Sequence, residues 1–279
     1  MKRTILILLI MLLGVGILLY PTVSNYLANK NGSHVVDSYD ESVKKKTEEE
    51  IAEEKRLAIE YNQSLTGENI QDPFVPGSGS VLPQNYEALL NMNKDGVMAS
   101  VLIPKISVKL PIYHGTSDKV LQIGAGHLEG TSLPIGGETT HTVITGHTGL
   151  THAKLFTDLE SLKKGDKFYI KVLNETLAYR IDTIEVIEPK DTGKLVPVAG
   201  QDYASLITCT PYGVNSHRLV VQGVRTEYVP GEEDGIKAIP GRSLMNNKVL
   251  IAALITAGIM SGLVISVAVI KRRRDKNEA

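Results

Sequence analysis

The sequence has a single cysteine, Cys209, so it cannot form an internal disulfide. It has no tryptophan and only 3 phenylalanines, which argues against a broad aromatic platform for a large planar ligand. Charge is balanced as well, because 30 basic and 31 acidic residues give a net charge of -1 and no drive toward nucleic acid. Zinc motifs are missing, since neither H-E-x-x-H nor paired cysteines occur. We therefore expect no nucleic-acid partner, no metal and no cofactor.

Two long apolar runs frame the chain, and the first is Ile5–Tyr20. It follows a basic start, and its 16 residues are few for a bilayer span and many for the core of a signal peptide. No convincing cleavage site comes after it. Residues 1–20 are therefore expected to be a signal anchor or a signal peptide, and the uncleaved anchor is favoured.

The second apolar run, Val249–Ile270, has 22 residues without a charge and predicts a transmembrane helix of about 33 Å. The basic tail 271–279 begins directly after it with Lys271–Arg274, which places that tail in the cytoplasm. The residues between the two runs would then lie outside the cell membrane. A lone thiol in such an exported chain is a buried small hydrophobe, an intermolecular linker or a nucleophile.

A charged extension, residues 21–80, comes between the first run and the domain. Within it, Ser38–Gln63 shows a weak apolar stripe among many Glu and Lys residues, which predicts a helix serving as a charged spacer. The following stretch, Asp72–Ser80, has two prolines and two glycines and fits neither a helix nor a central strand. It is either a linker or a stiff loop that plugs a site.

From Met98 the sequence changes to short β-like runs separated by turns, which predicts an antiparallel barrel or sandwich over residues 81–230, with a linker at 231–248. Helical interruptions are expected at Asp118–Ile123 and Ala153–Leu162. The expected strands are Ala99–Ile103, Val108–Tyr113, Thr142–Thr145, Lys167–Leu173, Leu177–Ile187, Ser205–Cys209 and Leu219–Val224.

Cys209 stands where an apolar strand ends in a turn. A thiol attacks only as the thiolate, so a catalytic cysteine needs a nearby base or cation. His147 lies between glycines just after the run Thr142–Thr145, a loop setting that suits an acid–base residue. Arg218 begins the next apolar run, and its fixed charge suits an oxyanion or a substrate carbonyl. Each residue alone also has a structural explanation, but their three matching positions favour a catalytic site.

Three segments of the sequence resemble motifs of the sortase family. Thr145-Gly146-His147-Thr148-Gly149-Leu150, continuing through Leu159, is similar to the histidine motif of sortases. Ser205-Leu206-Ile207-Thr208-Cys209, followed by Arg218, resembles their T-L-x-T-C … R signature, with serine in the first place. The loop Gly124–Pro134 also matches a sortase loop. The resemblance spans about residues 97–226 and implies a mainly β fold, the sortase-type eight-stranded β-barrel with short helices.

The motif Asp72-Pro73-Phe74 resembles the D-P-[FWY] lid of class C, the pilin-polymerising sortases of Gram-positive bacteria. In that class the acidic lid residue approaches the arginine, and the aromatic residue packs near the catalytic cysteine and histidine. A charged helical extension and a C-terminal span are also typical of class C, whereas class A sortases usually have only the N-terminal anchor. The lid and the second span together predict class C.

The resemblance implies a cysteine transpeptidase. Cys209 would attack the Thr–Gly bond of an LPxTG-like sorting signal and form a thioacyl enzyme, His147 would act as acid and base, and Arg218 would stabilise the oxyanion. The implied partners are pilin subunits that carry such a signal and an acceptor lysine. Two alternatives stay open: a sortase of another class that anchors surface proteins to peptidoglycan, and a non-catalytic membrane-anchored scaffold in which Cys209 is a core residue.

Two further residues lie near the motifs, and we expect site support from both. His127 belongs to the matching loop, and Thr208 precedes the cysteine. Four other histidines are expected at the surface or in loops; they are His114, His141, His152 and His217.

Overall fold

The structure is a computed structural model that describes residues 2–65, 70–74 and 85–237, together with eight positions between 251 and 269. The chain divides into two compact units, one of residues 27–241 and one of residues 1–26 with 242–279. Most of the predicted span 249–270, the whole basic tail 271–279 and most of the expected linker 231–248 lie outside the described residues, and the eight described positions of the span are helical.

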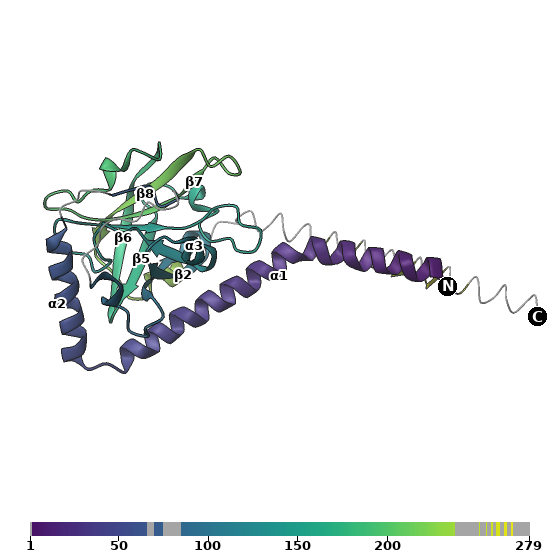
Figure 1. Ribbon diagram of the computed structural model, residues 1–279, viewed down its shortest axis with the longest axis horizontal. Helices are drawn as coiled ribbons and strands as arrows, with labels where there is room; N and C mark the ends of the chain where they lie inside the picture. The colour runs from purple at the N-terminus through teal and green to yellow at the C-terminus, as the bar shows by residue number, and fades with distance from the viewer. Residues whose placement is uncertain are drawn as a thin grey trace, which may run out of the picture. The chain divides into compact units, whose positions relative to one another are not determined.

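Eight strands close into a barrel in the order β1-β2-β3-β4-β7-β8-β6-β5, and β5 pairs back to β1. Figure 1 labels β2, β5, β6, β7 and β8 of this barrel. The strands are β1 Val97–Ile103, β2 Val108–His114, β3 Ala125–His127, β4 Thr140–Thr145, β5 Lys167–Val172, β6 Glu175–Ile187, β7 Asp202–Thr210 and β8 His217–Thr226. The predicted mainly β barrel is confirmed. The expectation of purely antiparallel pairing is wrong, because β2 pairs parallel with β3 and β4 pairs parallel with β7.

Helices are few between the strands, as expected. The helices of the described residues are α1 Lys2–Lys44, which begins in the other unit, α2 Glu48–Ser64, α3 Asp118–Ile123 and the 3-10 turns η1 Tyr86–Ala88, η2 Pro104–Ile106, η3 Leu159–Ser161, η4 Thr192–Leu195 and η5 Glu232–Gly235. The prediction of α3 is confirmed. The helix predicted over Ala153–Leu162 is wrong, since only η3 is helical there. The backbone N–H of Phe156 instead donates to the carbonyl of His147 (3.1 Å) and holds the preceding loop.

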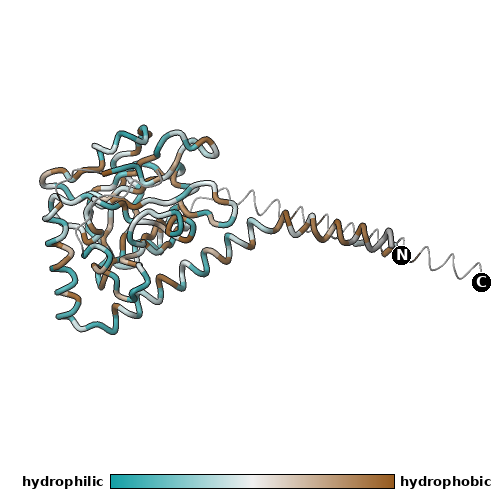
Figure 2. Tube along the Cα trace, viewed as in Figure 1, coloured by the Kyte–Doolittle hydropathy of each residue, from teal (hydrophilic) through white to brown (hydrophobic). Residues whose placement is uncertain are grey.

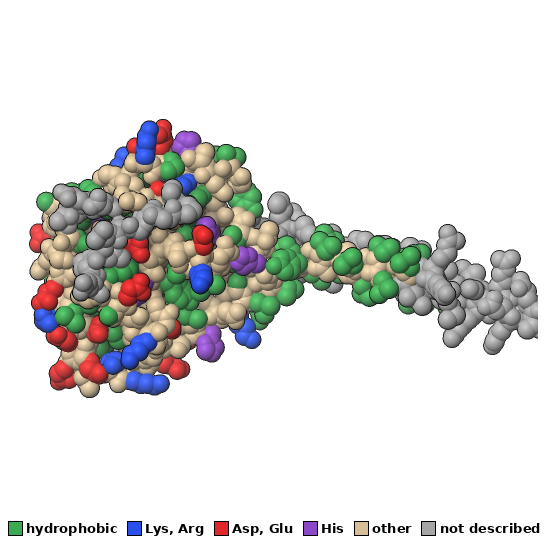
Figure 3. Space-filling view, in the orientation of Figure 1, with side chains coloured by type: hydrophobic (Ala, Val, Ile, Leu, Met, Phe, Trp, Pro, Cys, Tyr) green, Lys and Arg blue, Asp and Glu red, His purple; other side chains and the backbone are tan. Residues whose placement is uncertain are grey.

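Helix α1 begins with the apolar run and continues well beyond Tyr20. Its first part is brown in the hydropathy colouring of Figure 2, and green apolar side chains cover it in Figure 3. Among the described residues, α1 is the one helix whose length and composition would let it cross a bilayer. This agrees with membrane anchoring, and whether the segment is cleaved stays a prediction.

The charged stretch Ser38–Gln63, expected as one helix, is two helices. α1 ends at Lys44, and α2 begins at Glu48 behind the N-cap Thr47. The Thr47 hydroxyl accepts the N–H of Glu50 (3.2 Å), and the Glu50 carboxylate accepts the N–H of Thr47 (2.9 Å). This capping box satisfies two backbone donors at the start of α2, so the chain can begin a new helix there.

Both helices pack against the barrel rather than forming the free spacer that the sequence suggested. The Tyr39 hydroxyl on α1 donates to the carbonyl of Met98 (2.8 Å) and accepts the N–H of Leu173 (3.1 Å). On α2, Ala58 and Tyr61 are buried in the main hydrophobic core. Burying these side chains is favourable, and it fixes the chain that leads from α2 toward residues 70–74.

Candidate active site

Cys209 and Arg218 are direct partners across two neighbouring antiparallel strands. Cys209 is the last residue but one of β7, Arg218 is the second residue of β8, and their Cα positions pair in register. Side chains of directly opposed residues lie on the same face of a sheet. The thiol is 9% exposed and the Arg218 side chain is buried beside it. The register therefore places a fixed cation next to the only thiol of the chain.

His147 reaches the same end of the barrel through the parallel pairing of β4 with β7. Thr145, the last residue of β4, pairs with Ile207, and parallel strands end at the same edge. The loop is held there, because Gly146 N–H donates to the Ile207 carbonyl (3.0 Å) and the Thr208 hydroxyl donates to the Gly146 carbonyl (2.7 Å). The three candidates predicted from sequence thus lie at the ends of neighbouring strands β4, β7 and β8.

A short segment distant in sequence, residues 70–74, covers this end of the barrel, and we call it the lid segment. The Asp72 carboxylate accepts two hydrogen bonds from the Arg218 guanidinium, from Nε at 2.7 Å and from Nη2 at 2.6 Å. Both side chains are buried, with relative exposures of 6% and 9%. Arg218 also donates through Nη1 to the carbonyls of Asn215 and His217. The contact is a bidentate, charge-assisted pair, which is both strong and directional.

The Phe74 ring lies against both His147 and Arg218. Its ring centroid lies 5.5 Å from that of His147, and the Arg218 Cζ lies 4.9 Å from the Phe74 centroid. Phe74 also packs on an apolar cluster in which Ile70 is buried. That cluster comprises Ile70, Leu128, Val143, Ile187, Leu195, Ile207 and Val220. The sequence reasoning missed Ile70, although an apolar residue two positions before Asp72 was a signal that the segment packs.

Burial is the largest influence on the titration of both reacting groups. It raises the pKa of the Cys209 thiol, an effect that the Arg218 cation opposes and the Asp72 carboxylate reinforces. It lowers the pKa of the His147 imidazole, against the opposing charge of Asp118. Both shifts favour neutral side chains, because burial penalises charged forms. The raised pKa favours the thiol form of Cys209 over the thiolate, which is the attacking species.

The two supporting residues lie in different places. Thr208 holds the His147 loop, as described above. His127 is fully buried on the short strand β3, where Nδ1 bonds the Tyr86 hydroxyl (2.9 Å) and Nε2 faces the Ser132 carbonyl (2.9 Å). Burial lowers the pKa of His127 to about 4, so the ring is neutral and donates from Nε2 to the carbonyl. Its partners make it a packing and hydrogen-bonding residue of the barrel.

Two of the other histidines are not at the surface as the sequence suggested. His114 ends β2 and is buried, with its ring nitrogens facing the carbonyls of Gly96 and Leu89. His141 is buried on β4, where Nε2 bonds the Ser205 hydroxyl (2.8 Å) and Nδ1 faces the Val196 carbonyl (3.2 Å). The ring nitrogens of both histidines thus face polar groups on neighbouring strands and loops, which is compatible with their burial.

The described residues contain no group of three or more His, Cys, Asp or Glu side chains arranged to hold a metal ion. A buried thiol, an imidazole on an adjacent strand end and a buried guanidinium define a cysteine-dependent acyl-transfer site.

The comparisons with known proteins agree with this chemistry. The sortase domain family matches residues 101–226. Sortase A of Bacillus anthracis is 30% identical over 166 residues, 59% of this chain and 77% of that protein. Sortase C-1 from Actinomyces oris shares 50% identity over 64% of this chain and 99% of that one, with a TM-score of 0.59. The pilus-related sortase C of Group B Streptococcus shares 44% identity over 69% and 97%, with a TM-score of 0.64. The chain therefore belongs to the sortase family of cysteine transpeptidases, and within that family to class C.

Proposed function

We propose that this sortase polymerises pilins, with Cys209 as nucleophile, His147 as acid and base, and Arg218 as the group that binds the oxyanion. The observation that carries the proposal is the lid segment's double contact: Asp72 pairs with Arg218, and Phe74 lies against His147. A segment that binds two of the three reacting groups controls access to the third. The non-catalytic scaffold that the sequence left open does not fit a cysteine transpeptidase.

In the first half-reaction the Cys209 thiolate attacks the threonine carbonyl of an LPxTG-like sorting signal. The carbonyl oxygen gains the negative charge, and the guanidinium of Arg218 stabilises it. When the intermediate collapses, the Thr–Gly C–N bond breaks and the His147 imidazolium gives its proton to the departing glycine amine. The product is a thioester on Cys209 and a neutral His147 imidazole.

In the second half-reaction the side-chain amine of a lysine on another pilin attacks the thioester carbonyl. The neutral imidazole of His147 takes the proton from that nitrogen, and the C–S bond breaks to return the Cys209 thiolate. An isopeptide bond then joins the two pilins. The thiolate and imidazolium that begin the next cycle are thereby regenerated.

The lid segment suppresses this chemistry in two ways. It buries the thiol, and the Asp72 carboxylate offsets the one nearby cation that lowers the thiol pKa. When the segment leaves, Arg218 is released for the substrate and acts unopposed on Cys209. Pro73 is buried between the two contacting residues and stiffens the segment. Thr208 and His127 support the site from behind by fixing the His147 loop and β3.

The proposed placement puts the catalytic unit outside the cell membrane. The apolar α1 and the charge-free run 249–270, followed by the basic tail 271–279, support two anchors with both chain ends on the cytoplasmic side. Substrate pilins would meet the enzyme at that outer surface.

The test is to incubate the full chain in detergent with candidate pilins and look for a covalent ladder on denaturing gels. We expect a ladder, and we expect Cys209→Ala and His147→Ala each to abolish it without changing the circular dichroism melt. Near-normal polymer in either variant would refute the assigned roles. In a parallel reaction to which a peptidoglycan-type peptide amine is added, products in which one pilin is joined only to that amine would make the chain an anchoring sortase instead.

A further inference from the structure

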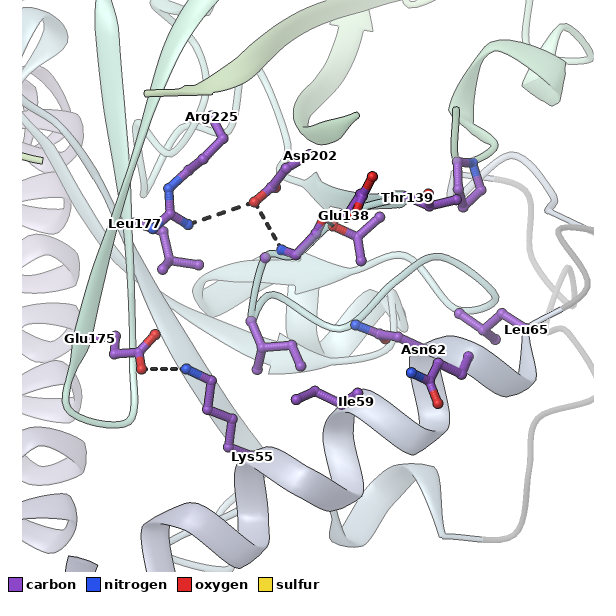
Figure 4. A pocket seen from close by; sticks show the side chains of 16 residues that line it. Lys55, Ile59, Asn62, Leu65, Glu138, Thr139, Glu175, Leu177, Asp202 and Arg225 are labelled. Atoms are coloured by element: carbon purple, nitrogen blue, oxygen red, sulfur yellow. Dashed lines mark hydrogen bonds and ion pairs between the residues drawn. The ribbon is translucent and has the colours of Figure 1, made fainter. Parts of the chain in front are cut away.

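A pocket lies at the end of the barrel where β4 and β7 begin, whereas Cys209 lies where β7 ends. Figure 4 shows the side chains that line it. Its volume is about 730 Å³, within the usual range for ligand sites. One wall is the C-terminal half of α2, and the other consists of the turn before β4 and the starts of β4 and β7. Because β4 and β7 run from this pocket toward His147 and Cys209, the pocket is separate from the catalytic groups.

The lining of this pocket is mixed, and five apolar side chains form part of it beside charged and polar ones. Ile59 on α2 and Leu177 on β6 lie on opposite sides of it in Figure 4, and Ile135, Leu65 and Pro197 also line it. Ile59 is 40% exposed although α2 is otherwise rich in charged residues. An apolar ligand group seated between Ile59 and Leu177 would remove exposed apolar surface from water, which favours binding.

The two basic side chains of the pocket are each close to a carboxylate of the pocket. Lys55 pairs with Glu175, so that lysine is neutralised. Asp202 accepts the N–H of Gly137 (2.9 Å) and lies 3.8 Å from Arg225 Nη1.

Glu138 also lines the pocket, and its side chain is exposed. It has no hydrogen bond or ion pair within the described part of the chain. Lys55 and Arg225 each lie beside a carboxylate, whereas Glu138 has no basic partner among the described residues. The pocket therefore favours a cationic ligand over an anionic one.

We propose that this pocket binds an extended polypeptide segment that carries an apolar side chain next to a lysine or arginine. The apolar side chain sits between Ile59 and Leu177, and the basic one pairs with Glu138. A polypeptide is the occupant that fits, because an apolar group and a cation at close spacing are what such a segment presents, and polypeptides are what a sortase acts on. The assignment does not depend on the roles of Cys209, His147 and Arg218, since it lies at the other end of the barrel.

The experiment measures peptide binding to the full chain in detergent, in the Cys209→Ala background so that no acyl transfer occurs. The probe is a fluorescein-labelled Leu-Lys-Val-Lys peptide amide, followed by fluorescence anisotropy. The matched probe is Leu-Glu-Val-Glu. We expect saturable binding of the basic peptide and at least about tenfold weaker binding of the acidic one, as repulsion from Glu138 replaces attraction. No saturable binding of the basic peptide, or equal affinity for both, would overturn the proposal.

Two variants locate the binding. Ile59→Ala should weaken it about tenfold, because two to three methylene equivalents of contact are lost. Glu138→Gln should weaken it about three- to fivefold, which is typical of one partly exposed ion pair, and the loss should shrink at high salt. The controls Val186→Ala and Glu49→Gln change an exposed apolar residue and an exposed acid, both away from the pocket. Unchanged affinity in both pocket variants, or an equal loss in the controls, would place the binding elsewhere and refute the site.

Discussion

Replacing Asp72 by asparagine should open the lid segment. The substitution keeps the size of the side chain and removes the charge that pairs with Arg218 through two hydrogen bonds. In the closed state Arg218 is then left buried beside a neutral amide. In the open state the guanidinium is hydrated, so the closed state alone loses stability.

The magnitude follows from the burial of the pair. Removing one partner of a buried ion pair costs about 3–5 kcal/mol, and because the amide oxygen of asparagine still accepts one hydrogen bond, we expect the lower end, about 3 kcal/mol. At about 1.4 kcal/mol for each factor of ten, the ratio of open to closed lid should rise by about two orders of magnitude. The thiol pKa should fall as well, because Asp72 raises it in the native protein.

The assay is the rate of alkylation of Cys209 by iodoacetamide, measured from pH 6 to 10. Because this is the only cysteine, every modified molecule reports on the site. We expect Asp72→Asn to react up to about a hundredfold faster at neutral pH. The midpoint of its pH profile should also move to lower pH. Phe74→Ala should raise the rate too, by exposing His147 and the thiol.

Asp191→Asn, which changes an exposed carboxylate, is the matched control and should leave the rate unchanged. If Asp72→Asn also alkylates at the native rate, the lid segment does not limit access to the thiol. If the rate rises but the pH midpoint stays in place, the Asp72 charge does not act on Cys209, and only the steric part of the reasoning survives.

Three further outcomes are expected. Gly146→Ala should lower kcat in a peptide-cleavage assay and change KM by a smaller factor. The reason is that a Cβ at this position would lie 2.7 Å from the Phe156 ring and would displace the His147 loop. Thr208→Val should lower kcat about fivefold, the equivalent of the single hydrogen bond to the Gly146 carbonyl. Stability should fall as pH drops from 6.5 to 4, because burial holds the pKa of His127 and His141 at about 4, so unfolding takes up one proton at each. A melting temperature that is flat across this window would contradict the last prediction.

Much of the site was readable from the sequence because its residues stand where strands end. Cys209, His147 and Arg218 each adjoin an apolar run, and turns beside strands are where reactive side chains are exposed. Asp72 and Phe74 could be assigned through their resemblance to a lid, but their partners could not be derived from local pattern. A contact between residues 146 positions apart, as in the Asp72–Arg218 pair, has no signal in a single sequence.

The parts that escaped prediction depend on long-range pairing. β3 has only three residues, Ala125–His127, too few for a period-two pattern. The parallel pairing of β4 with β7 joins strands that are far apart in the chain, and alternation within a strand does not reveal the direction of its neighbour. His141 looked like a surface residue because its partners, Ser205 and Val196, are distant in sequence. The start of α2 was also missed, although the Thr47–Glu50 capping box encodes it locally.

The closed strand order has a consequence for an enzyme that works on polypeptides. An open sheet offers a row of unpaired backbone groups along its edge, and any extended chain can add to it as another strand. Here β1 pairs with β5 and completes the circle, so the barrel has no such edge. A substrate segment therefore cannot be held by adding as a strand to the sheet, and its recognition depends on the side chains and loops that the barrel presents.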